Sequence, residues 1–430
     1  MISGLKIDKL FNRFDYDIEL HKNRITILTG PNGFGKSTIL KIISALSSSN
    51  FLFFYKLAFE SIYIEFDDGE NICIQKENIG SNSKKSRLII DGKELPNLYF
   101  ESNFVKAPWI HRVSPTEWLD FKVHRIINRD EIISNIVNDI DDIKKLSEYI
   151  EIPKGKSKQY AEALAKLKII SEKCGNVRLI SEQRLIRKEF DEDHDEKIVD
   201  VISQLPEKMK SRISKISADY SKAANELDST YPQRLLATKI GLTDEQEFQK
   251  KLQDANEKFK KLSTYDLADI TLIKPTAYEE EFSKALKIYF EDFEKKYKVF
   301  SNFIDRLDLY TDIINARLNF KSIRITRDEG LIIVDDNDSS KHLKLEQLSS
   351  GEKQEIVLFY ELIFETEKQL LLLIDEPEIS LHIVWQKMFM QDLDRVVNLG
   401  NLKVIIATHA PQIINNRWDL QIDLGELYGG

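Results

Sequence analysis

The chain has 430 residues, 42% of them hydrophobic and 31% charged, with a net charge of −9. These values are typical of a globular protein with two or three domains, and they argue against a broadly basic surface that coats DNA, although not against a local basic groove. Cys73 and Cys174 form no metal-ligand spacing or disulfide framework, and charged residues interrupt the longest apolar stretch, 356–374, so we expect a cytoplasmic protein without a membrane partner.

Short strands are expected over residues 1–29, and the last of them leads into a glycine-rich loop. Residues 24–29 form a β-branched run that indicates a buried strand, and apolar residues at helical spacing follow over residues 37–43. The loop between them fits the pattern G-x-x-x-x-G-K-[ST]. Its residues are Gly30, Pro31, Asn32, Gly33, Phe34, Gly35, Lys36, Ser37 and Thr38.

Strand, glycine loop and helix form the arrangement that a phosphate-binding site needs. The glycines let several backbone N–H groups point at one anion, and the helix N-terminus adds a partial positive charge at the same place. In this pattern Lys36 reaches the β- and γ-phosphates, and the hydroxyl of Ser37 ligates Mg²⁺. A chance match to the pattern is the alternative, and the flanking strand and helix argue against it.

Two hairpins are expected after the first helix, because Asp68-Gly69 and Asp91-Gly92 are tight-turn signals between strand-like runs. From about residue 118 the pattern becomes helical. Charged amphipathic segments of low glycine content cover residues 119–150 and 158–173. A strand over residues 176–181 then interrupts the helices.

Residues 194–319 are expected to be helical, with two runs of apolar residues spaced alternately by four and three positions, as in heptad seams. The first seam comprises Met209, Ile213, Ile216, Tyr220, Ala223 and Leu227, and the second comprises Phe248, Leu252, Ala255, Phe259 and Leu262. A capping box of Thr243 and Gln246 is expected to open the second helix. The pattern fits an antiparallel helical hairpin, and two amphipathic helices packed on a bundle fit it equally well.

Two more strands are expected between residues 322 and 335. A short polar segment that contains Ser349, Gly351 and Glu352 then precedes a helix that runs to about residue 367. A serine at the helix entry can simply cap the helix, with Glu352 in its first turn. The functional alternative is a second anion site, formed by a loop of small residues and a helix N-terminus.

Two buried strands carry acidic and imidazole groups at their ends. The apolar run before Asp375 and Glu376 is typical of a central strand in a parallel sheet. We expect Asp375 to hold the Mg²⁺ shell, and Glu376 to accept a hydrogen bond from a water and aim that water at the γ-phosphate. A second run ends at His409, where such a sheet binds its ligand, so His409 is expected to bond the γ-phosphate. The alternatives are that the two carboxylates merely end a strand and that His409 is a plain surface residue.

These motifs occur in the order seen in ABC-type ATPases, and the chain resembles that class. The resemblance implies that residues 30–38 are the Walker A motif, residues 348–354 the signature, residues 372–377 the Walker B motif and His409 the switch histidine. The implied cofactors are ATP and Mg²⁺.

In that class the signature of one subunit closes over the nucleotide held by another subunit. The resemblance therefore implies that Ser349 and Gly351, with Glu352 beside them, act in trans on the ATP of a partner copy. The sequence departs from the class at Ser350, where a glycine is usual, and at residues 378–382, which differ from the corresponding loop of transporters.

The class also has a glutamine that contacts Mg²⁺ just before a helical insertion. Gln183 follows a strand and precedes helices, as this resemblance requires, and an exposed loop glutamine is the alternative. The implied catalytic residues are Lys36, Glu376 and His409, and the implied Mg²⁺ ligands are Ser37, Asp375 and Gln183.

Leu348 lies 310 positions after Thr38, which is far more than a transporter ATPase needs. Because the surplus is helical, the chain resembles the SMC, RecF and OLD-type ATPases more closely. Within that class, residues 348–364, 375–382 and 407–424 resemble the stand-alone ATPases of bacterial anti-phage systems, first the AriA subunits of PARIS and then the PtuA subunits of Septu. The implied fold is an α/β ABC-type head, with a mixed sheet around a P-loop core and a helical, partly coiled-coil-like insertion.

We expect the head to be interrupted by its helical parts. The expected divisions are an N-terminal lobe with Walker A at 1–118, a helical segment at 119–175, a strand and glutamine loop at 176–192, a helical insertion at 193–319, and a C-terminal lobe with the signature, Walker B and switch histidine at 320–430. His409 is followed by 21 residues, so we expect no nuclease domain after it.

The resemblance implies an ATP-hydrolysing sensor and scaffold of an anti-phage system. Its expected partners are further copies of itself, as an ATP-dependent homodimer or higher oligomer, a separate Toprim-like or HNH effector nuclease, and a phage-encoded trigger. DNA binding is compatible with this role but not required. The alternative is a DNA repair or recombination ATPase of the RecF or SMC type, which requires salt-sensitive DNA binding. A transporter subunit is disfavoured by the long helical insertion.

Overall fold

The computed structural model describes most of the chain as two compact units. Unit 1 comprises Met1–Val199 and Thr366–Gly430, and unit 2 comprises Asp200–Glu365. None of the described helices has both the length and the apolar character that a membrane span needs. The positions outside the description are 21–23, 79–85, 96–109, 114–116, 122–124, 129–154, 156, 183, 191–195, 240, 243, 268–277, 339, 367–369 and 430.

Unit 1 contains a five-stranded parallel sheet in the order β11, β17, β18, β3 and β19. These strands are β3 (Ile25–Thr29), β11 (Val177–Ile180), β17 (Leu371–Asp375), β18 (Lys403–Ala407) and β19 (Gln421–Asp423). All residues of β3 and β17 are buried, as their uninterrupted apolar runs predict for inner strands of a parallel sheet. The four strands expected at these places are confirmed, and β19 adds an edge strand that was not predicted.

An antiparallel sheet in unit 1 has the order β2, β1, β4, β5, β6 and β7. Asp68-Gly69 and Asp91-Gly92 form its β4–β5 and β6–β7 turns, so both hairpin predictions are confirmed. The strands are β1 (Ile2–Leu10), β2 (Phe14–Glu19), β4 (Ser61–Phe66), β5 (Asn71–Asn78), β6 (Ser86–Ile90) and β7 (Lys93–Leu95). One apolar core joins residues of both sheets with α1 (Lys36–Ser47), α2 (Phe51–Lys56) and α5 (Ser157–Cys174).

The helix expected from residue 119 is wrong in its first part. A three-stranded sheet is formed by β8 (Ile110–Arg112), β9 (Glu117–Asp120) and β10 (Arg125–Asn128). Ile126 and Ile127 pair with Leu119 and Trp118, and both of these β9 side chains are buried. β-branched and aromatic pairs of this kind favour strands, and they outweigh the helical spacing of the charged residues. Residues 129–154 lie outside the described part, and α5 confirms the helix at 158–173.

The remaining described elements of unit 1 are two paired strands and the helices that follow β17. β12 (Ile186–Phe190) pairs with β13 (Glu196–Asp200), so the helix expected from residue 194 begins only at Val201. After β17 come the 3₁₀-helix η3 (Pro377–Ser380), α10 (Ile383–Gly400), α11 (Pro411–Ile414), the 3₁₀-helix η4 (Trp418–Leu420) and α12 (Leu424–Gly429).

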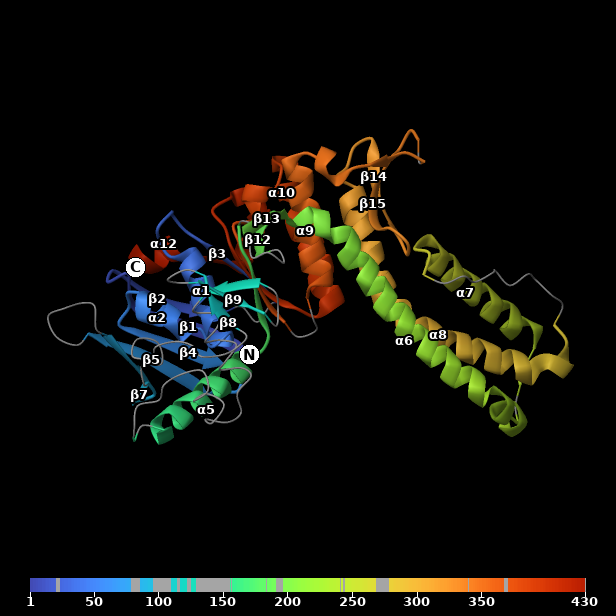
Figure 1. Cartoon of the computed structure of the whole chain (residues 1–430), viewed down its shortest axis with the longest axis horizontal. Coiled ribbons are helices and arrows are strands. Elements are labelled where there is room, and N and C mark those ends of the chain that lie inside the picture. Colours follow the sequence, from blue (N-terminus) through green and yellow to red (C-terminus); the bar gives the residue numbers. More distant parts are fainter. Residues whose placement is uncertain are drawn as a thin grey trace. The chain divides into compact units, whose positions relative to one another are not determined.

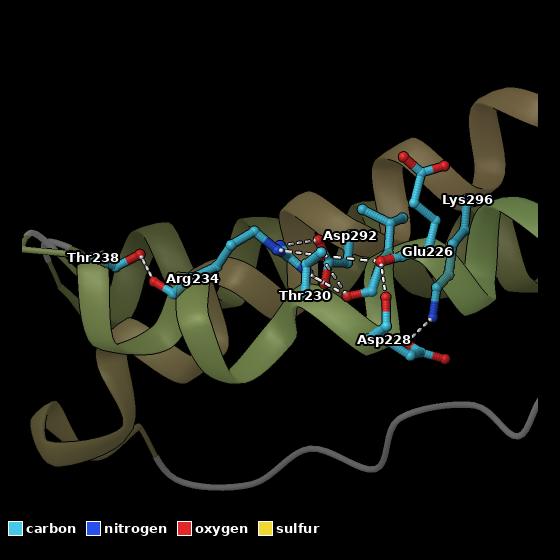
Figure 2. Close-up of polar contacts among 9 residues, drawn as sticks. Glu226, Asp228, Thr230, Arg234, Thr238, Asp292 and Lys296 are labelled. Carbon is cyan, nitrogen blue, oxygen red and sulfur yellow. Dashed lines mark hydrogen bonds and ion pairs between the residues drawn. The ribbon is translucent and has the colours of Figure 1, made fainter.

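Unit 2 is built on two long helices, α6 (Val201–Ala237) and α8 (Ser283–Asn315), which lie side by side (Figure 1). Their contacts run in opposite directions along the sequence, because Tyr220 contacts Phe300 whereas Arg234 pairs with Asp292. The two helices are therefore antiparallel. Figure 2 shows this region, in which the guanidinium of Arg234 donates hydrogen bonds to both carboxylate oxygens of the buried Asp292.

Helix α6 packs on α8 rather than on α7 (Glu245–Thr264), so the expected α6–α7 hairpin does not form. Both α6 and α7 pack on α8, so the bundle alternative describes these helices better. The second seam is buried, as its spacing predicts, but against α8, where Phe248 and Phe259 contact aromatic residues. The cap of α7 is Asp244, whose carboxylate accepts a hydrogen bond from the backbone N–H of Glu247. The cap therefore lies one residue later than expected, and Thr243 lies outside the described residues.

A small antiparallel sheet and one more helix complete unit 2. The sheet comprises β14 (Lys321–Thr326), β15 (Gly330–Asp335) and β16 (His342–Leu343), and the 3₁₀-helix η2 (Leu345–Gln347) leads to α9 (Ser350–Phe364). The strands at 322–327 and 331–335 are confirmed. Helix α9 packs on α8 and α6, where Tyr310, Tyr360 and Phe364 form an aromatic cluster.

Gly330 offers a test of the packing in unit 2. Its φ is +72°, and a Cβ at this position would lie 2.0 Å from the carbonyl oxygen of Pro206 in α6. We expect Gly330→Ala to lower the free energy of unfolding by about 2–3 kcal/mol in urea titrations, because it adds a backbone clash to the cost of a left-handed conformation. Gly69→Ala is the control, since Gly69 has φ +80° but open space around it. Equal losses in the two variants would contradict the inferred clash.

Candidate active site

The glycine loop lies between β3 and α1, as predicted. Gly30, Gly33 and Gly35 have φ values of +137°, +84° and +90°. Residues other than glycine rarely adopt such values. A Cβ on Gly35 would also lie 2.9 Å from a methyl group of Leu10. The loop therefore needs glycine both for its backbone conformation and for its packing.

Lys36 is 4% exposed, and its ammonium points back into the loop. Its Nζ donates to the carbonyl oxygen of Gly30 at 2.9 Å and to that of Pro31 at 3.4 Å. Among the described residues it has no carboxylate partner. A buried cation held only by carbonyl groups is suited to an anionic ligand such as a phosphate.

The other loop residues have supporting positions. Phe34 packs against Phe14 and the ring of Tyr428, and its carbonyl oxygen accepts a hydrogen bond from the hydroxyl of Tyr16 at 2.7 Å. Pro31, Asn32 and Gly33 are exposed, and Thr38 is half-buried in the first turn of α1. The exposed part of the loop is thus free to meet a ligand, while its aromatic part is anchored in unit 1.

Ser37 and Asp375 meet at the carboxyl edge of the parallel sheet. The Ser37 hydroxyl donates to Oδ1 of Asp375 at 2.8 Å. Asp375 is 8% exposed, and burial raises the pKa of its carboxyl group, an effect that the Ser37 hydrogen bond partly offsets. A buried carboxylate next to a hydroxyl is an all-oxygen donor set that fits Mg²⁺, which takes one or two protein ligands and completes its shell with water and phosphate oxygens.

Glu376 and His409 end neighbouring strands and lie close together. Asp375 pairs with Ala407 in the β17–β18 register, so both strands end at the same level. Glu376 has φ +43° and ψ +62°, and its backbone N–H donates to the carbonyl oxygen of Ala407 at 2.8 Å. Its Oε1 lies 3.5 Å from Nδ1 of His409. A left-handed glutamate is a costly conformation of the kind found at functional sites.

The signature residues lie at the N-terminus of α9 in unit 2. Ser349 caps the helix and forms a capping box with Glu352, whose side chain accepts the Ser349 backbone N–H at 2.9 Å. Lys321 pairs with Glu352 at 3.0 Å. Burial raises the pKa of Glu352, but the hydrogen bonds from Ser349 and the Lys321 pair outweigh it and leave the pKa lowered. The predicted helix cap is confirmed, and the anion-binding role of this loop stays a prediction. Gly351 lies in the first turn of α9 and is partly exposed.

Four predicted site residues do not lie with the others in the described part of unit 1. Gln183 lies outside the described residues, so its contact with Mg²⁺ stays a prediction. Ser349, Gly351 and Glu352 belong to unit 2, whereas the glycine loop and the Walker B residues belong to unit 1. Within the described residues, no group of three His, Cys, Asp or Glu side chains is arranged to hold a metal by itself.

Glu378 is a site residue that sequence reasoning missed. Its Oε1 accepts hydrogen bonds from the Thr408 hydroxyl at 2.7 Å and from the His409 backbone N–H at 2.9 Å. Glu378 is buried, although it lies on the short 3₁₀-helix η3. The available signal was a third acidic residue only two positions after Glu376, which was read only as part of the following loop.

Comparison with known proteins places these features in a family. Residues 1–414 match the family described as AAA ATPase domain (AAA_15). No curated protein matches the chain.

Several solved structures are similar to the chain at low identity. The Pyrococcus furiosus Smc head domain with an extended coiled coil, bound to the C-terminal domain of ScpA, is 13% identical over 97% of this chain and 91% of that chain, with a TM-score of 0.37. The Thermotoga maritima SMC head domain is 11% identical over 96% and 90%, with a TM-score of 0.33. The recombination mediator RecF of the RecFOR pathway is 12% identical over 96% and 94%, with a TM-score of 0.30. These likenesses are too weak to assign a partner or substrate.

The family match spans the glycine loop, the strand that ends at Asp375 and the strand that ends before His409. It therefore includes the elements that carry the candidate site residues of unit 1, together with the whole of unit 2. The chain belongs to the AAA ATPase domain family, and its activity is the hydrolysis of ATP.

Proposed function

We propose that ATP is hydrolysed where the strand ends of unit 1 meet. The observation that carries this proposal is the convergence of Lys36, the Ser37–Asp375 pair and the Glu376–His409 pair on one edge of the parallel sheet. The glycine loop and the N-terminus of α1 hold the phosphates, and Lys36 neutralises charge on the β- and γ-phosphates. Ser37 and Asp375 hold Mg²⁺, with Gln183 as a further ligand.

Glu376 is the proposed general base of the reaction. It accepts a proton from the attacking water, the water oxygen bonds to the γ-phosphorus, and the bond to the β–γ bridging oxygen breaks. His409 contacts the γ-phosphate. Mg²⁺, when bound, stabilises the charge that develops on the phosphate oxygens.

The second part of the proposal is that two copies share each ATP. Ser349 and Gly351 sit at the start of a 15-residue helix, and Ser349 is exposed. A helix N-terminus attracts anions, which supports a role at a γ-phosphate presented by a partner copy. The same order of motifs in ABC-type ATPases also supports this arrangement.

Mixing two inactive variants tests the shared site. We expect Lys36→Ala and Ser349→Arg each to abolish hydrolysis alone. In an equal mixture of the two proteins, half of the dimers combine both variants, and each of these has one intact site made of wild-type Lys36 and wild-type Ser349. About a quarter of the wild-type rate should therefore return, if the two-fold interface is isologous. A mixture that stays inactive while both variants still bind to wild-type protein would contradict the proposal.

We propose that copies of this protein, assembled by ATP binding into a dimer or higher oligomer, hold a separate Toprim-like or HNH effector nuclease inactive. A phage-encoded trigger then releases the nuclease. The similarity of residues 348–364, 375–382 and 407–424 to stand-alone anti-phage ATPases supports this role. The test is co-purification with the product of the neighbouring gene, with and without ATP. A chain that purifies alone and shows DNA-stimulated ATP hydrolysis would favour the repair alternative instead.

A further inference from the structure

Glu378 joins the ends of two strands that carry the proposed catalytic groups. It lies on η3, just after β17, and its Oε1 accepts hydrogen bonds from Thr408 and from the backbone of His409, just after β18. Thr408 in turn accepts a hydrogen bond from the backbone N–H of Ala410 at 3.0 Å. One buried carboxylate oxygen thus fixes the backbone on which the imidazole of His409 is mounted.

The same oxygen also faces the imidazole ring. Nδ1 of His409 lies 3.4 Å from Oε1 of Glu378 and 3.5 Å from Oε1 of Glu376. A carboxylate that accepts a hydrogen bond from one ring nitrogen of a histidine keeps the proton on that nitrogen and sets the orientation of the other nitrogen. With Nδ1 turned toward carboxylates, Nε2 is the nitrogen left to contact a ligand.

The two glutamates have different surroundings, which separates their roles. The Glu378 side chain is 6% exposed, and the Glu376 side chain is 20% exposed. Oε1 of Glu378 accepts from two donors, whereas its buried Oε2 has no hydrogen-bond partner among the residues that the structure describes. A buried acceptor without a partner is costly, so the position calls for a compensating role. The more exposed Glu376 remains the group that a water can reach.

We propose that Glu378 is a positioning residue for ATP hydrolysis, which holds His409 with Nδ1 protonated so that Nε2 faces the γ-phosphate. This inference rests on the proposed role of His409. It assigns no proton transfer to Glu378 itself. Glu378 acts only through the backbone and ring of His409.

A double-mutant cycle in the full chain tests this inference. We expect Glu378→Ala to lower the single-turnover rate of ATP hydrolysis by about 10- to 100-fold, as loss of an outer-shell partner of a functional histidine commonly does. The KM for ATP should stay within about twofold, because no group that touches the ribose, base or glycine loop is removed. In a His409→Ala background the same change should have almost no further effect, because its route of action is gone.

Two further variants separate positioning from folding. Glu378→Gln retains one oxygen acceptor without the charge, and it should keep the wild-type melting temperature and recover part of the rate lost in Glu378→Ala. Asp392→Asn is the control, because Asp392 is another buried carboxylate of unit 1, on α10. Its effect on the rate should be the same with or without His409.

The tautomer of His409 gives a readout that a merely structural brace would not change. In ¹⁵N-histidine-labelled protein, at a pH where the ring is neutral, we expect the wild-type signal to show a protonated Nδ1. The Glu378→Ala signal should shift to protonated Nε2, the form usual in water. The inference would be overturned if the rate reduction in the double variant equalled the product of the reductions in Glu378→Ala and His409→Ala. An unchanged His409 tautomer in Glu378→Ala would overturn it as well. If Glu376→Gln hydrolysed ATP normally, the proposed function itself would fail, so the two failures are distinguishable.

Discussion

Replacing Glu376 with glutamine is expected to slow ATP hydrolysis by about 10²- to 10⁴-fold, the range that loss of a general base produces. Glutamine has nearly the same shape, so the left-handed backbone and its hydrogen bond to Ala407 should persist. The glycine loop, Lys36 and the Ser37–Asp375 pair are untouched, so ATP and Mg²⁺ should still bind. The variant should therefore accumulate in its ATP-bound form.

The measurements are the steady-state rate of phosphate release and the size of the protein with and without ATP. We expect the Glu376→Gln variant to form a long-lived larger species in the presence of ATP, visible by light scattering. Glu257→Gln, on the exposed face of α7, is the matched control and should leave both quantities unchanged. Hydrolysis by Glu376→Gln at the wild-type rate would show that another group activates the water.

Breaking the buried ion pair in unit 2 is expected to be the most destabilising single change. Nε of Arg317, just after α8, lies 3.2 Å from Oε1 of Glu355 on α9, and the two side chains are only 2% and 3% exposed. The guanidinium also stacks over the ring of Phe359 at 4.8 Å and donates to the carbonyl oxygen of Ile313. Glu355→Gln removes one charge of this buried pair, which costs about 3–5 kcal/mol.

Urea unfolding of single and double variants checks this expectation. Arg317→Met together with Glu355→Leu should recover much of the stability, because replacing both charges by apolar groups removes the desolvation cost. The control is Arg87→Met, which breaks an exposed pair with Glu77 and should cost about 1 kcal/mol or less. If Glu355→Gln lowered the free energy of unfolding no more than the control does, water would have to reach this ion pair.

Local signals predicted well the elements of unit 1 that carry the candidate site. β3, the glycine loop and α1 are consecutive, so one short motif specifies their order and conformation. β17 and β18 were found because inner parallel strands are apolar on both faces, which leaves uninterrupted runs in the sequence. The ends of such strands meet, so Asp375, Glu376 and His409 were found together.

The errors and omissions come from contacts that local patterns do not contain. The strand β10 was missed because its pairing with buried Trp118 and Leu119 is tertiary, whereas charge spacing suggested a helix. The seam of α6 predicted an apolar face but not which helix would cover it, and α8 rather than α7 does so. Glu378 was missed because its hydrogen bonds reach residues 30 positions away.

The strand order of the parallel sheet has a consequence for protein synthesis. β3, near the start of the chain, pairs with β18 and β19, and both are translated after all of unit 2. At a translation rate of about 5–20 residues per second, roughly 20–75 seconds pass between the synthesis of β3 and the addition of Lys403. A nascent chain therefore exposes both edges of β3 during this time, an aggregation hazard that a chaperone would relieve. The parallel sheet that carries the candidate site can be completed only once residues 403–423 have emerged.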